Sequence, residues 1–294
     1  MKGGHRYRVE RNLGNIVVHV ILGAIGVICL LPLLLIISAS FSKETEIARY
    51  GYTFFPRTFT TYAYGYILQN PTQILRGYGV TTFVTVVGTL VGLLMMSLLA
   101  YVLSRPDFAL RKHLSFYVFF TMLFNGGLVP WYIWMTKGLH LKETVWSLIW
   151  PYLIVPWYVL LLRTYFSGLS QDLLDAARID GAGEWRLFFQ IVVPLSTPSL
   201  ATVGLFLILK YWNDWYLAML FVQENAKLQP LQYMLYRILT NVQAIARAPG
   251  STSMPPILTV RMAMSVLATG PAALVFLLVQ RYFVRGITIG ALKY

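Results

Sequence analysis

The sequence contains separate apolar blocks, each about 20 residues or longer, divided by polar links. A block of that length is what an α-helix needs to cross a hydrocarbon core of roughly 30 Å. The alternating pattern of a transmembrane barrel is absent, so we expect helices that satisfy their own backbone groups. Charged residues make up 12% of the chain, whereas a soluble domain carries about 25%. The sequence therefore predicts an all-α integral membrane protein.

Six transmembrane helices are predicted. They cover residues 15–40, 78–104, 114–136, 145–166, 197–222 and 260–283. The first block follows a basic segment, as in a secretory signal, but it is long for one and no clear cleavage site ends it. We therefore expect it to remain as a span. The third span contains Asn125, Gly126, Gly127 and Pro130, which permit close helix packing or a kink, and we favour a packing notch over a gating hinge.

The distribution of Lys and Arg predicts the orientation of the chain. Basic residues gather in residues 1–14, in the link 105–113 and near the C-terminus, while the longer loop 41–77 has few for its length. Lys and Arg in short loops favour the cytoplasmic side. Both termini and the link 105–113 are therefore predicted to be cytoplasmic. The outer loops then fall at 41–77, 137–144 and 223–259.

Composition excludes several classes of function. The net charge is +13, but the cations lie at span ends, so we expect no nucleic-acid binding. The single cysteine, Cys29, allows no intrachain disulfide. The histidines are too scattered for a metal site: His5, His19, His113 and His140. The chain has no Gly-Lys pair, so no phosphate-binding loop of the ATPase type is present.

The largest cytoplasmic loop, residues 167–196, predicts two short helices separated by a glycine turn. Ser170 is placed to cap a first helix that ends near Asp180. Asp180 could in turn cap the second, amphipathic helix. Ala176 and Ala177 form a small flat surface that would let another protein approach closely. On physical grounds alone, an interfacial helix that ties two spans together is the simpler interpretation.

This loop resembles the signature loop of ABC importer permeases. In that motif, Glu-Ala-Ala is followed after three residues by Gly and after nine more by Ile-x-Leu-Pro. The matching positions are Ala176, Ala177, Gly181, Ile191 and Pro194. Asp175 stands where Glu is usual and Val193 where Leu is usual, and both replacements keep the chemical character. The string from Asp180 to Ala182 is similar to the carbohydrate branch.

Two further segments extend the resemblance over most of the chain. Trp212-Asn213-Asp214-Trp215 in the fifth span looks like the Trp-Asn-acidic pattern of MalG-type sugar permeases. The ending from Arg285 to Lys293 is similar to the Gly-rich tail of that branch. Together with residues 125–127, the tail looks closest to the LplC/YtcP group, which is associated with complex oligosaccharides.

The resemblance implies a MetI-like fold, a bacterial cell membrane location, and no catalysis or cofactor on this chain. It implies partners: an ABC ATPase dimer carrying ATP and Mg, a second homologous permease subunit, an extracytoplasmic sugar-binding protein and membrane lipid. The implied cargo is a sugar, taken to be an oligosaccharide. The residues implied to couple the loop to the ATPase are Asp175, Ala176, Ala177, Asp180, Gly181, Ala182, Ile191 and Pro194.

The resulting division of the chain has four parts. They are a cytoplasmic N-terminus (1–14), a first helix with its outer loop (15–75), a MetI-like permease domain (76–284) and a cytoplasmic tail (285–294). The alternative is a secondary transporter or a membrane-embedded enzyme. A proton-coupled carrier usually shows several carboxylates at mid-membrane, whereas Asp214 is nearly alone here.

The fifth span carries a polar and aromatic cluster. Lys210 and Asp214 are four residues apart, so on a continuous helix they share a face and can pair. Trp212, Asn213, Asp214 and Trp215 could instead line a sugar path, because aromatic faces suit sugar rings and polar groups suit hydroxyls. We lean towards the ion pair as a structural element, with the tryptophans closer to the path.

Overall fold

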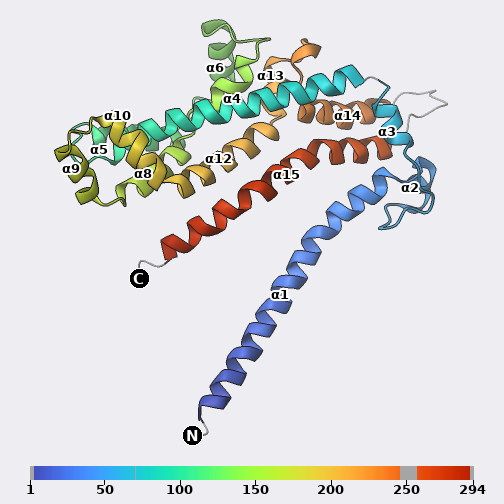
Figure 1. Ribbon diagram of the computed structural model, residues 1–294. Helices are drawn as coiled ribbons and strands as arrows, with labels where there is room; N and C mark the ends of the chain where they lie inside the picture. Colours follow the sequence, from blue (N-terminus) through green and yellow to red (C-terminus); the bar gives the residue numbers. More distant parts are fainter. Residues whose placement is uncertain (1–2, 70, 246–256, 292–294) are drawn as a thin grey trace. The chain divides into compact units, whose positions relative to one another are not determined.

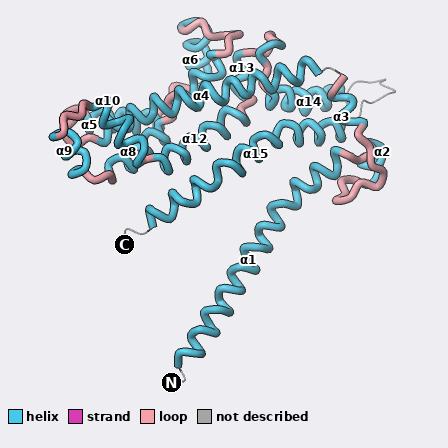
Figure 2. Tube along the Cα trace, in the orientation of Figure 1, coloured by secondary structure: helices cyan, strands magenta, loops and turns pink. Residues whose placement is uncertain are grey.

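The computed structural model describes residues 3–69, 71–245 and 257–291 of the chain. This part is almost wholly helical (Figures 1 and 2). Within these ranges the structure has no β-strand, and an isolated bridge joins Ser42 to Phe59. The all-α prediction is therefore confirmed.

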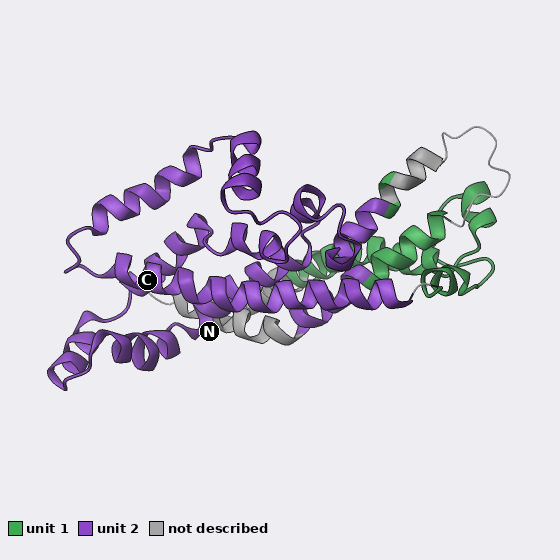
Figure 3. Cartoon of the chain, turned by 90° about the horizontal axis from the view of Figure 1, so that it is seen from above, with its two compact units in different colours: residues 1–70, 238–267 green, residues 71–237, 268–294 purple. Residues whose placement is uncertain are grey.

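The chain separates into two compact units (Figure 3). One consists of residues 1–70 and 238–267, and the other of residues 71–237 and 268–294. Each unit has its own internal packing.

The first unit contains the long helix α1 (Gly3–Ser40) and two short helices, α2 (Glu44–Tyr50) and α3 (Tyr62–Ile67). The side chains of α1 from residue 17 to residue 34 are exposed and mostly apolar, as expected of a helix that faces lipid. Helices α2 and α3 lie in a segment that was predicted as an outer loop. Both are too short to give a clear periodic signal in the sequence.

Glu44 at the start of α2 holds the N-terminus of helix α15 (Ile257–Ala291). Its Oε1 accepts a hydrogen bond from the backbone N–H of Leu258 at 2.8 Å. Its Oε2 accepts from the backbone N–H of Thr259 at 2.9 Å and from the Thr259 hydroxyl at 2.8 Å. A helix leaves its first N–H groups without intrahelical partners, and a carboxylate there also suits the helix dipole. Glu44 thus fixes where α15 begins.

The second unit is built around helix α4 (Pro71–Ser104), which packs chiefly against α8 (Pro156–Ser167) and α12 (Thr197–Trp212). Small residues let the helices approach closely, as is usual in membrane bundles. A Cβ atom at Gly88 would lie only 2.5 Å from Cζ of Tyr211. The Tyr211 hydroxyl donates to the Ile149 carbonyl at 2.9 Å, so this contact ties three helical segments together.

Several of the predicted spans are interrupted. The helix axis bends by 111° between α5 and the segment 128–138, and by 46° between the segment 146–152 and α8. It bends by 82° between the segment 184–195 and α12. The described residues hold three helices that are long and apolar enough to cross a membrane, or six if each bent pair is one span. The bounds of the segments involved are α5 Arg111–Leu123, α6 Leu128–Ile133, the π-helical turn η1 Trp134–Gly138, α7 Trp146–Ile149 and the 3-10 turn η2 Trp150–Tyr152.

The break in the third span corrects the expected packing notch. The helix ends at Leu123 and restarts at Leu128, with Gly127 at φ +91° between them. A Cβ built at Gly126 would meet nothing within 4 Å. Pro130 lies in the first turn of α6, where its missing N–H costs nothing. The glycines therefore turn the chain, and among the described residues no neighbouring helix packs against them.

The fifth span and the loop after it also differ from expectation. Helix α12 ends at Trp212, not near 222, and a separate helix α13 (Tyr216–Phe221) follows. The expected outer loop 223–259 contains the 3-10 turn η4 (Ala226–Leu228) and the helix α14 (Leu231–Ile245). The backbone N–H of Leu231 donates to the Thr81 hydroxyl at 2.9 Å, which fastens the start of α14 to α4.

Candidate functional site

The loop of residues 167–196 folds as a helix, a glycine turn and a second helical segment. Helix α9 (Gln171–Ile179) is followed by α10 (Glu184–Leu187), the π-helical turn η3 (Phe188–Val192) and α11 (Val193–Leu195). Gly181 has φ +81°, a left-handed conformation that glycine adopts without steric cost. Its backbone N–H donates to the Arg178 carbonyl, and that of Ala182 to the Ala177 carbonyl, both at 3.0 Å. The turn therefore closes the end of α9.

The expected caps of the two helices are only partly present. Ser170 stands at the N-cap of α9 with an extended backbone, but its side chain makes no capping hydrogen bond. Asp180 does not cap the second helix, because its own N–H donates to Ala176 and completes the end of α9. Gly183 occupies the N-cap of α10 instead.

The motif residues are spread over two faces of the loop. Asp175, Ala176, Asp180, Gly181 and Pro194 are exposed, whereas Ala177, Ala182 and Ile191 are partly buried. The most exposed large apolar side chains in the loop are those of Ile179 (87% exposed) and Trp185 (68% exposed). One face of the loop is thus available to a partner, and the other packs on the bundle. The coupling role of these residues stays a prediction.

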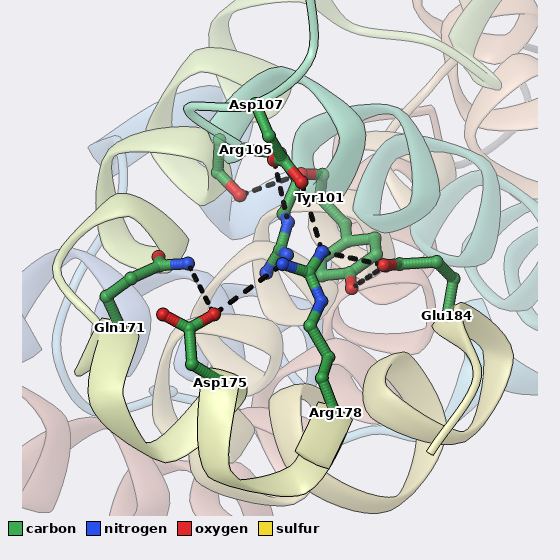
Figure 4. A network of polar contacts seen from close by, with 8 residues as sticks. Tyr101, Arg105, Asp107, Gln171, Asp175, Arg178 and Glu184 are labelled. Carbon is green, nitrogen blue, oxygen red and sulfur yellow. Dashed lines mark hydrogen bonds and ion pairs between the residues drawn. The ribbon is translucent and has the colours of Figure 1, made fainter. Parts of the chain in front are cut away.

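Arg178 is the centre of a charged network that holds the loop (Figure 4). Its Nη2 lies 2.7 Å from Oε1 of Glu184, across the glycine turn, and 3.1 Å from Oδ2 of Asp107. Its Nη1 lies 3.6 Å from Oδ1 of Asp175, one turn earlier on α9. A guanidinium group can serve several carboxylates at once because its donors form a planar fork. One side chain therefore links α9, α10 and the link after α4.

Two residues at the end of α4 complete the network. The Tyr101 hydroxyl donates to Oε2 of Glu184 at 2.5 Å, and the Tyr101 ring lies 5.3 Å from that of Phe188. The side chain of Arg105 is buried, and its Nε lies 3.5 Å from Oδ1 of Asp107. The loop is thereby fixed to the longest helix of the second unit.

Sequence reasoning missed this network, although one signal was available. Asp107 is an acid within an otherwise basic link, and Arg178 and Glu184 flank the glycine turn. What the sequence does not show is that the link after α4 lies beside α9, 71 residues further along the chain.

The fifth-span cluster corrects the expected ion pair between Lys210 and Asp214. Helix α12 ends at Trp212, so the two residues do not keep the spacing of a continuous helix. Asp214 instead accepts a hydrogen bond from the Tyr152 hydroxyl at 2.5 Å and from the Leu217 N–H at 2.9 Å, which caps α13. The Nζ atom of Lys210 lies 4.1 Å from the centroid of the Tyr152 ring. Tyr152 thus connects the two charges, which form no direct pair.

The two tryptophans of the cluster have separate structural contacts. Trp212 is 7% exposed, and its Nε1 donates to the Ala268 carbonyl at 2.9 Å. Trp215 stacks on Tyr236 with ring centroids 4.3 Å apart. Asn213 is exposed and accepts a hydrogen bond from Gln232 Nε2 at 3.3 Å. That these residues line a sugar path stays a prediction, with Trp212 facing the bundle in this conformation.

The described residues contain no group of three or more His, Cys, Asp or Glu side chains that could hold a metal ion. The arrangement is that of a helical bundle with a partly exposed loop fastened to it.

Known proteins share this arrangement over nearly the whole chain. The protein LplC of Bacillus subtilis (strain 168) is 39% identical over 275 residues, which cover 92% of each chain. The polygalacturonan/rhamnogalacturonan transport system permease protein YtcP of the same organism is 36% identical over 97% of this chain and 100% of its own. The crystal structure of a bacterial ABC transporter involved in the import of the acidic polysaccharide alginate matches with a TM-score of 0.79 and 30% identity. That match covers 94% of this chain and 98% of the other.

The match to a protein family is also broad. The family described as "Binding-protein-dependent transport system inner membrane component" matches residues 79–289, which include the charged network, the loop and the fifth-span cluster. Its members are membrane components of transport systems, not enzymes. The MetI-like fold expected from the motif is confirmed. The chain is a multi-pass membrane protein that belongs to the family of binding-protein-dependent transport system inner membrane components.

Proposed function

We propose that the chain is one permease subunit of an ATP-driven importer and forms part of the membrane path for an oligosaccharide. Support comes from the relatives, since the YtcP protein is named for polygalacturonan and rhamnogalacturonan transport and the alginate importer for an acidic polysaccharide. The observation that carries the proposal is the Arg178 network, which fastens the motif-bearing loop to α4. A loop that transmits force from an ATPase to the membrane helices needs such a connection to one of those helices.

The partners would divide the work. Two ATPase subunits would hold ATP and Mg and would bind the cytoplasmic loops of this chain and of a second, homologous permease. An extracytoplasmic sugar-binding protein would deliver the cargo. The exposed side chains of Ile179 and Trp185 supply apolar contact area beside the small residues Ala176 and Gly181. An interface with buried apolar anchors and close backbone approach suits a contact that must carry load.

In this arrangement both termini and the loop 167–196 face the cytoplasm. The basic residues in short loops support this orientation. Reporter fusions after Lys112 and after Leu228 should give opposite locations, and matching locations would contradict the topology. The C-terminal stretch from Gly286 is helical as far as Ala291, and we expect it to reach the ATPase subunits. Lys293 lies outside the described residues.

The loop can be tested with variants of two neighbouring glycines. Gly181 has φ +81°, which proline cannot adopt, so Gly181→Pro should abolish uptake while delivery by the binding protein persists. Gly181→Ala should have a smaller effect of the same kind, with a strain of roughly 1 kcal/mol. Gly183 has φ −73° and open space around it, so Gly183→Ala is the matched control and should leave uptake unchanged.

Ala177→Trp tests the same surface without changing the turn. Ala177 is partly buried beside the core of the bundle, so a large side chain should displace α9 from its seat. Uptake should be lost while the complex still contains this chain. Normal transport by an assembled Ala177→Trp or Gly181→Pro complex would refute the coupling role of the loop.

A further inference from the structure

A cavity in the second unit lies where three interrupted helices meet. Its volume is about 360 Å³, and the lining residues come from α6 and the break before it, from η2 and from the start of α13. They are Asn125, Gly127, Leu128, Trp131, Pro151, Tyr152, Tyr216 and Leu217. Irregular backbone at membrane depth is tolerated where it is buried in protein or lines a water-filled cavity. The three breaks therefore mark a candidate ligand site.

The depth of this cavity follows from helix lengths. On the cytoplasmic side of each break lie 13 residues of α5, 12 of α8 and 16 of α12. At 1.5 Å per residue, these helices reach about 18–24 Å from their cytoplasmic ends. In a hydrocarbon core of roughly 30 Å, the cavity then lies in the outer half of the membrane. A cargo delivered from outside would meet it early.

The lining has the chemistry of a site for an uncharged, hydroxyl-rich ring. Trp131, Tyr152 and Tyr216 supply aromatic surface, which suits the C–H faces of a pyranose. Asn125 uses its Oδ1 to accept from the Gly127 N–H at 2.9 Å, and among the described residues its Nδ2 has no partner. That amide is left to donate to a ligand. Few polar groups among aromatic walls are typical of small-molecule sites of this volume.

Charge is the feature that sets specificity. Among the described residues, no Lys, Arg, Asp or Glu lines the cavity. Two charged residues contact the lining residues and are themselves engaged: Asp214 accepts hydrogen bonds from the Tyr152 hydroxyl and the Leu217 N–H, and Nζ of Lys210 lies 4.1 Å from the centroid of the Tyr152 ring. A carboxylate in such a cavity would lose its hydration without gaining a cation, which is unfavourable.

We propose that this cavity binds a neutral sugar residue of the cargo, with Trp131 as the stacking surface and Asn125 as the hydrogen-bond donor. The proposal rests on the proposed import function and refines its substrate class. It differs from the cargo of the alginate importer, which is described as an acidic polysaccharide.

The test uses the complete importer purified into nanodiscs, with equilibrium binding of labelled tetrasaccharides in the absence of the binding protein. The probes are neutral tetramers of glucose, xylose, arabinose and rhamnose, and the acidic tetramer of galacturonate. At least one neutral tetramer should bind, and Trp131→Ala should weaken it roughly tenfold, because one aromatic contact and its buried area are lost. Trp157→Ala is the control, since Trp157 is an exposed tryptophan of α8 outside the cavity.

A second variant guards against misfolding of Trp131→Ala. Asn125→Asp keeps the acceptor for the Gly127 N–H and the shape of the side chain, while replacing the free amide by a carboxylate. It should weaken binding of the neutral tetramer at least fivefold in an importer that assembles normally. No binding of any neutral tetramer, or tighter binding of the galacturonate tetramer, would overturn the proposal.

The site and the import function fail in different ways. Equal binding by the parent importer, Trp131→Ala and Asn125→Asp would overturn the site, while ATP-driven uptake would still hold. Absence of ATP-driven uptake in the parent importer would overturn the import function itself.

Discussion

Arg178 reaches across the Gly181 turn to Glu184, with Nη2 of the arginine 2.7 Å from Oε1 of the glutamate. The contact joins the end of α9 to the start of α10, so the glycine turn is closed both by backbone hydrogen bonds and by a charged pair. Because the same guanidinium also reaches Asp107, the loop cannot shift without disturbing the link after α4. The charged network thus joins the loop 167–196 to the link that follows α4.

Replacing Arg178 should uncouple the loop more than it destabilises the protein. Exposed ion pairs contribute about 0.2–1 kcal/mol each, so Arg178→Ala should lower the melting temperature only slightly. Uptake per ATP hydrolysed should fall several-fold, because the loop loses its contact with α4. Arg178→Lys should be intermediate, since an ammonium group cannot serve the carboxylates as a planar fork does.

The control for this experiment is Arg186→Ala. Arg186 lies in the same loop and contacts Gln190 within its own helical segment. Its removal should leave the ratio of uptake to ATP hydrolysis unchanged. If Arg178→Ala and Arg186→Ala gave the same ratio, the network would be only a surface feature.

Gly88→Ala should destabilise the second unit. A Cβ at this position would lie 2.5–2.8 Å from three atoms of the Tyr211 ring, so α4 and α12 would have to separate. Overpacking of this kind costs about 1–3 kcal/mol, which should appear as a lower melting temperature in detergent. Gly79 lies on the same helix with nothing within 4 Å, so Gly79→Ala should have little effect. Equal stability of the two variants would show that the close approach does not exist.

Variants of Lys210 and Asp214 distinguish a relayed cluster from a direct ion pair. Asp214→Ala removes the acceptor of Tyr152 and the cap of α13, and each buried group left unpaired costs about 1–3 kcal/mol. Lys210→Met should cost less, because Lys210 contacts the face of the Tyr152 ring. In a direct pair, removing both charges would restore stability. Here the double variant should remain as unstable as Asp214→Ala, measured by yield and thermal unfolding of the complex.

Glu44 should stabilise the N-terminus of α15 in the first unit. Glu44→Ala removes three hydrogen bonds at the start of α15, and loss of a helix cap costs about 0.5–2 kcal/mol. Amide exchange at Leu258 and Thr259 should accelerate in this variant. Glu46 bonds Thr58 instead, so Glu46→Ala should leave exchange at those two amides unchanged. Unchanged exchange at these amides in Glu44→Ala would show that Glu44 does not hold the start of α15.

Hydropathy alone predicted the parts of the fold that depend on membrane thickness. The six apolar blocks agree with the six candidate spans, each bent pair counted as one, and the fifth begins with α12 at Thr197. The extent of α9 agrees as well, but it was predicted from the residues at its two ends, Ser170 and Asp180. Hydropathy did not reveal the helix breaks at Phe124–Gly127 and Asn213–Trp215. Both lie inside apolar blocks and barely change the mean hydropathy of those blocks. Helices α2, α3 and α14 were missed for the opposite reason, since they lie in segments too polar or too short to score as spans.

The candidate site was predictable where its residues form a motif with fixed spacing. The positions from Asp175 to Pro194 could be found by pattern, and the positive φ at Gly181 agrees with the glycine turn. The contacts of Tyr101 and Asp107 join segments far apart in the chain, and one sequence holds no record of which distant segments meet. The prediction of a Lys210–Asp214 pair was wrong because it assumed a continuous helix, whereas α12 ends at Trp212.

The central claim is that this chain serves an importer driven by ATP. The most direct measurement is uptake of labelled oligosaccharide by proteoliposomes that contain this chain, its partner permease, the ATPase subunits and the binding protein. Uptake should require enclosed ATP and Mg, should cease when the binding protein is omitted, and should not respond to an imposed proton gradient. Uptake that follows the proton gradient in the absence of ATP would contradict the account and would favour a secondary transporter.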